Sequence, residues 1–105
     1  MNFKAKLWEN KGQGRTATLA GSAEDEMQAA GIALAKLYKT PGNIVTKESV
    51  VDITMDRPGQ KEVTTPFPVA DIVRWHRSGP GQAFAAKSEN GDLRFIEEIG
   101  KNLGI

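Results

Sequence analysis

The chain has 105 residues, of which 39% are hydrophobic and 26% are charged, and its formal net charge is +1 at pH 7. This length fits a single domain covering residues 1–105, and the near-neutral charge excludes a global field that recruits nucleic acid. Because there is no cysteine, disulfides, thiolate nucleophiles and cysteine-bound zinc are excluded. The start lacks a signal-peptide core and no apolar run could span a bilayer, so we expect a cytoplasmic protein with no membrane partner.

The first part of the chain predicts a β-hairpin. Apolar and polar residues alternate over 3–8 and again over 15–21, which is the period of half-buried strands. The sequence NKGQG at 10–14 supplies glycines for the connecting turn. With Phe3, Ala5 and Leu7 in the core, the side chains expected to point outward are those of Lys4, Lys6 and Trp8.

A long amphipathic helix is expected over about 22–39. Ser22 followed by Asp25 forms a capping-box pattern, and the acidic residues in the first turn suit the helix dipole. Apolar residues recur at helical spacing as far as Tyr38, and Pro41-Gly42 ends the pattern.

The rest of the sequence predicts two more hairpins, and between them a segment for which a helix and a strand are both possible. Alternation over 49–67 around the turn RPGQ indicates the second hairpin, with prolines that place its last strand at an edge. AFAAKS and LRFIEE around Asn90-Gly91 indicate the third. Between them, apolar spacing favours a second short helix at about 66–77, whereas the β-branched residues there favour a strand. The expected fold is α+β, a mostly antiparallel sheet of three hairpins with the long helix on one face.

The stretch RWHRSGPGQAF, residues 74–84, concentrates chemically versatile side chains but matches no catalytic motif. Pro80 lacks the N–H that a phosphate loop uses, and no third glycine follows in register. His76 has Asp71 and Ser78 nearby in sequence, without a triad signature. One histidine with scattered carboxylates offers little to a metal ion. We therefore predict no catalytic residue, no metal and no cofactor, and a turn at Gly-Pro-Gly.

Two basic islands are the candidate binding surface. Residues 1–20 carry four cations and one acid, and residues 74–87 carry three cations and no acid. Aromatic side chains beside cations are typical of protein interfaces and of single-strand binding faces. The predicted binding residues are Lys4, Lys6, Trp8, Lys11, Arg15, Arg74, Trp75, His76 and Arg77. Whether the two islands form one patch is left open by the sequence.

Three function classes follow from these observations. The favoured one is a small non-enzymatic interaction module that binds a protein partner or a second copy of itself, using exposed sheet edges. The alternative is a protein that binds single-stranded or duplex nucleic acid through the basic and aromatic surface. The third is an enzyme or small-ligand protein with a site around His76. The partner, the biological process and the oligomeric state do not follow from the sequence.

Overall fold

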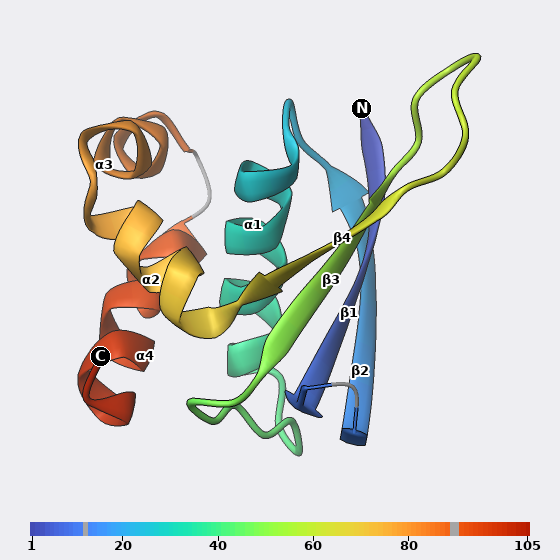
Figure 1. Ribbon diagram of the computed structural model, residues 1–105. Helices are drawn as coiled ribbons and strands as arrows, with labels where there is room; N and C mark the ends of the chain where they lie inside the picture. The colour runs from blue at the N-terminus through green and yellow to red at the C-terminus, as the bar shows by residue number, and fades with distance from the viewer. Residues whose placement is uncertain (12, 89–90) are drawn as a thin grey trace.

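A four-stranded antiparallel sheet with helices on one side forms the fold, which confirms the expected α+β class (Figure 1). The computed structural model describes residues 1–11, 13–88 and 91–105. The strands are β1 (Asn2–Asn10), β2 (Gln13–Ser22), β3 (Val50–Met55) and β4 (Thr64–Pro68). The helices are α1 (Glu26–Lys39), α2 (Val69–Arg77), α3 (Gly79–Lys87), the 3₁₀ helix η1 (Gly91–Arg94) and α4 (Phe95–Leu103).

The sheet has the strand order β2-β1-β3-β4. The first two expected hairpins, β1–β2 and β3–β4, therefore lie side by side in it. The β1–β2 register shifts between Trp8 and Asn10, next to Gly14 at φ 84°. This is the glycine-dependent bulge that increases the twist of a hairpin end. Gly12, the other glycine of the predicted turn, lies outside the described residues. On the opposite edge, Pro66 and Pro68 are in β4, as the sequence predicted.

Helix α1 begins at Glu26, four residues later than expected. Asp25 is the N-cap, and its side chain accepts a hydrogen bond from the Gln28 backbone N–H at 2.8 Å. Ser22 instead pairs with Asn2 at the end of β2, and its hydroxyl donates to the Met1 carbonyl at 3.2 Å. The capping-box interpretation was therefore wrong, because pairing with β1 holds Ser22 in an extended conformation.

Helix α1 lies between the sheet and the other helices, so it is buried on two sides (Figure 1). Small side chains make this possible, since four alanines and a glycine of α1 are buried beside two leucines. A Cβ at Gly31 would lie 3.1 Å from the indole of Trp75, so this glycine admits an aromatic ring of α2. The core residues on either side of α1 include Leu7, Val51, Ile53, Val69, Ile72, Ile96 and Ile99.

The third expected hairpin is wrong, whereas the short helix at about 66–77 is confirmed as α2. The residues assigned to that hairpin form α3, η1 and α4. Two local signals explain the difference: Ser78 caps α3 with proline in its first turn, and Leu93, Ile96 and Ile99 recur at helical spacing and are buried. The expected turn at Asn90-Gly91 falls partly outside the described residues.

Over the described ranges, no helix has the length and apolar character required to cross a bilayer.

Candidate functional site

No helix of the described residues covers one face of the sheet, which we call the open face. All helices lie on the other side (Figure 1), so every second side chain of each strand is directed away from them. The strand register assigns the residues of the open face, which are Lys4, Lys6, Trp8, Thr16, Thr18, Ala20, Asp52, Thr54, Thr64 and Pro66. The structure therefore confirms that Lys4, Lys6 and Trp8 share a face that is directed away from the core.

Trp8 is held in place by polar contacts on the open face. Its indole Nε1 donates a hydrogen bond to Oδ2 of Asp52 at 2.8 Å, across the β1–β3 pair. The ammonium of Lys6 lies 4.4 Å from the centroid of the Trp8 ring, in a cation–π contact. Trp8 and Lys6 are half-buried, while Lys4 is exposed. The indole is thus fixed in orientation before any ligand arrives.

The open face is hollowed along the strands. One hollow of about 670 Å³ extends over all four strands, and its lining includes Trp8, Lys6 and Asp52. A second hollow of about 580 Å³ shares Lys4 with the first and extends to Asp56 and Glu62. The surface therefore has an aromatic and basic centre and an acidic end.

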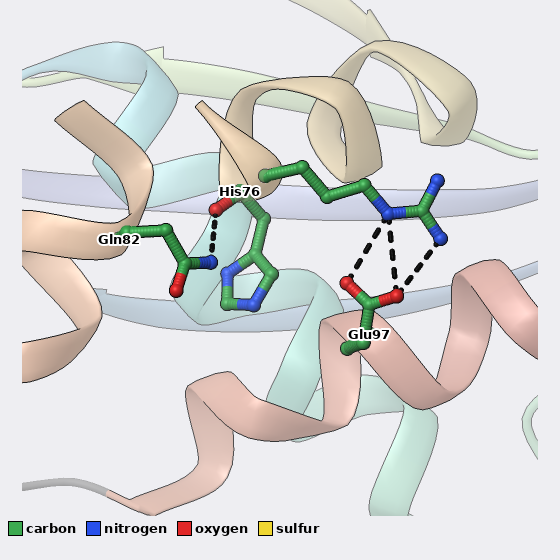
Figure 2. A network of polar contacts seen from close by, with 4 residues as sticks. His76, Gln82 and Glu97 are labelled. Carbon is green, nitrogen blue, oxygen red and sulfur yellow. Dashed lines mark hydrogen bonds and ion pairs between the residues drawn. The ribbon is translucent and has the colours of Figure 1, made fainter. Parts of the chain in front are cut away.

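The second basic island lies on α2 and α3, and its two arginines are in ion pairs. Arg74 pairs with Asp71 at 3.1 Å, and Arg77 contacts both carboxylate oxygens of Glu97 at 3.0 and 3.1 Å (Figure 2). The hydrogen bond from Arg77 also holds the pKa of the Glu97 carboxyl below its ordinary value. These arginines are engaged with carboxylates of the same chain.

Of the aromatic side chains of this island, Trp75 is half-buried and His76 is buried. Trp75 packs beside Gly31 of α1 and lies 5.9 Å from the ring of Phe84, centroid to centroid. His76 is 5% exposed, and no described residue is a hydrogen-bond partner of its Nδ1. Burial lowers the pKa of His76, which the Glu97 carboxylate opposes and the Arg77 cation reinforces.

The two islands do not form one patch. Lys4, Lys6 and Trp8 are on the open face, whereas α2 packs on the far side of α1 (Figure 1). Lys11 is exposed in the β1–β2 connection. Arg15 borders a small hollow beside the loop that follows α1, and its backbone N–H donates to Glu9 Oε2 at 3.2 Å.

The Gly-Pro-Gly sequence, where the sequence predicted a turn, is instead the first turn of α3, and the corner between α2 and α3 is at Ser78. The Ser78 hydroxyl donates to the Trp75 carbonyl at 2.5 Å and accepts from the Gly81 N–H at 3.4 Å. The amide of Gln82 donates to the His76 carbonyl at 2.6 Å (Figure 2). These contacts satisfy backbone groups at two adjoining helix ends, so the corner has a structural role.

Asp52 is the open-face residue that the sequence-based set of binding residues missed. Its alternation with Val51 and Ile53 indicates an outward side chain. The position of Asp52 beside Trp8 depends on the antiparallel pairing of β3 with β1, which local sequence patterns do not give.

Within the described ranges, no three His, Asp or Glu side chains are grouped to hold a metal ion. Comparisons with protein-family models, curated proteins and solved structures find no match to this chain.

Proposed function

We propose that the protein is a non-enzymatic interaction module that self-associates by pairing β2 of one copy with β2 of another. The observation that carries the proposal is the contrast between the two edges of the sheet. Strand β4 is short and contains Pro66 and Pro68, which limit strand addition. Strand β2 has 10 residues, and its sequence from Thr16 to Ser22 contains no charge and no proline. Proteins normally protect such an edge, so an unprotected one favours a role in pairing.

The sequence of β2 is compatible with antiparallel pairing to itself. About a two-fold axis at Thr18, Ala17 would oppose Leu19 and Thr16 would oppose Ala20 of the second copy, without opposing like charges. Ala17 and Leu19 are only partly buried against the core, so a second strand would cover more of their apolar surface. Pairing would extend the sheet from four strands to eight.

The enzymatic hypothesis gains no support from the geometry. The His76 side chain is only 5% exposed, which leaves little of it accessible to a substrate. Asp71, which lies near His76 in the sequence, pairs with Arg74.

Sedimentation velocity from micromolar to millimolar concentration tests the proposal. We expect the wild-type chain to form a dimer and Thr18→Lys to be monomeric, because the lysines of the two copies would oppose each other at the axis. The matched control is Thr64→Lys, which places the same charge on the exposed face of the opposite edge strand and should leave the dimer intact.

A wild-type chain that stays monomeric over this range would refute self-association. Equal loss of the dimer in both lysine variants would show that the contact does not run through β2. Circular dichroism of each variant establishes that the fold is retained.

A further inference from the structure

Lys4 and Lys6 present positive charge that no carboxylate of the described residues neutralises in an ion pair. The contrast is with α2, where Arg74 and Arg77 are both paired. An anionic ligand at the open face therefore has no ion pair to break. The two lysines are two residues apart on β1, so their Cα atoms are about 7 Å apart. This spacing suits consecutive phosphates of an extended strand.

Trp8 provides an aromatic surface beside these charges. Its orientation is fixed by Asp52, so little side-chain freedom remains to be lost when a planar group stacks on it. The Lys6 ammonium now occupies one face of the ring. A base stacked on tryptophan is worth more than an exposed cation–π contact, so a base can displace Lys6. The displaced ammonium would then be free to contact a phosphate.

From this arrangement we propose that the open face binds single-stranded nucleic acid, with one base stacked on Trp8 and adjoining phosphates at Lys4 and Lys6. The hollow over the four strands has room for such a chain, and threonine hydroxyls on its wall can bond to sugar and phosphate oxygens. A duplex does not fit this arrangement, because its bases are not free to stack on Trp8. The proposal is independent of self-association through β2.

Asp52 gives the site a base preference. Its Oδ2 accepts from the Trp8 indole, which leaves Oδ1 as an acceptor at the edge of the stacked base. Cytosine and adenine carry exocyclic amino donors, whereas thymine and uracil carry none. We expect a preference of about tenfold for oligodeoxycytidine over oligothymidine.

Fluorescence titration tests the site, because the chain has only two tryptophans. In a Trp75→Phe background, Trp8 reports alone, and we expect saturable quenching by short oligodeoxycytidine. Two phosphate contacts predict a slope of about −1.4 in log affinity against log salt. The double variant Lys4→Gln/Lys6→Gln should lose at least about tenfold in affinity and most of this slope.

The matched control is Arg74→Gln/Lys87→Gln, which removes the same charge from the helical layer and should bind as the parent chain does. Absence of quenching, or equal losses in both double variants, would overturn the proposal. Equal competition by inorganic polyphosphate would also overturn it, since a charged polymer without bases cannot stack. Equal affinity for oligothymidine would refute the role of Asp52.

Discussion

Replacing Gly81 with alanine should destabilise the fold strongly, whereas the same change at Gly79 should not. A Cβ at Gly81 would lie 2.0 Å from the carbonyl oxygen of Trp75 and 2.7 Å from the Cα of His76, both of them backbone atoms. A Cβ at Gly79 would have no heavy atom within 4 Å. Because backbone cannot rotate away as a side chain can, the α2–α3 corner must open. We expect a loss of about 3 kcal/mol in the free energy of unfolding.

Urea denaturation followed by far-ultraviolet circular dichroism measures both variants. The loss at Gly81 corresponds to a melting temperature lower by about 12 °C or more in a domain of this size. Gly79→Ala should stay within about 0.5 kcal/mol of wild type, since alanine is accepted in a first helical turn. If the two variants were equally stable, the close approach at this corner would be refuted as the reason for its glycine.

The other predictions concern a titratable group, an apolar core position and a buried hydroxyl. Since burial lowers the pKa of His76, the native state holds fewer protons than the unfolded state near the ordinary pKa. Stability should therefore be complete above about pH 7 and fall on acidification through about pH 6, by at most about 1.4 kcal/mol per pH unit; His76→Leu should remove this slope in urea titrations at each pH. Ile99→Ala, at a fully buried site, should cost about 3 kcal/mol in the same assay. Ser49→Ala should cost about 2 kcal/mol, because the Ser49 hydroxyl donates to the Glu9 carbonyl at 2.9 Å and accepts from the Thr46 N–H at 2.8 Å; a cost near zero would show that these groups find other partners.

Local patterns predicted the first half of the fold better than the second. Alternation fixed the faces of β1 and β3, and the helical period identified α1. The third hairpin was predicted wrongly for two reasons. The segment AFAAKS is short, and its apolar residues fit the period of a strand as well as that of a helix. In addition, Asn90-Gly91 is a pair that suits a hairpin turn. The decisive signals were the cap at Ser78 and the spacing of Leu93, Ile96 and Ile99. These signals are decisive because α1 is covered by η1 and α4 on the side away from the sheet, which is a tertiary contact that local patterns do not contain.

The candidate binding residues on β1 could also be predicted from local patterns, whereas the surroundings of those on α2 could not. Lys4, Lys6 and Trp8 were assigned to an outward face by their alternation with core residues, which requires no tertiary knowledge. The segment 74–77 was different, because its charges are neutralised by Asp71, one turn earlier on the same helix, and by Glu97 from α4. A basic cluster in sequence is therefore a weak guide to a basic surface when carboxylates from other elements pack against it.

The position of α1 between two layers sets an order for folding on the ribosome. Part of its apolar surface is covered by residues that are synthesised later than α1, among them Leu93 and Ile96. While those residues are still inside the exit tunnel, the emerged hairpins and α1 must leave one side of the helix in water. We therefore expect a nascent chain stalled before η1 to remain sensitive to protease, and resistance to arise abruptly once α4 emerges.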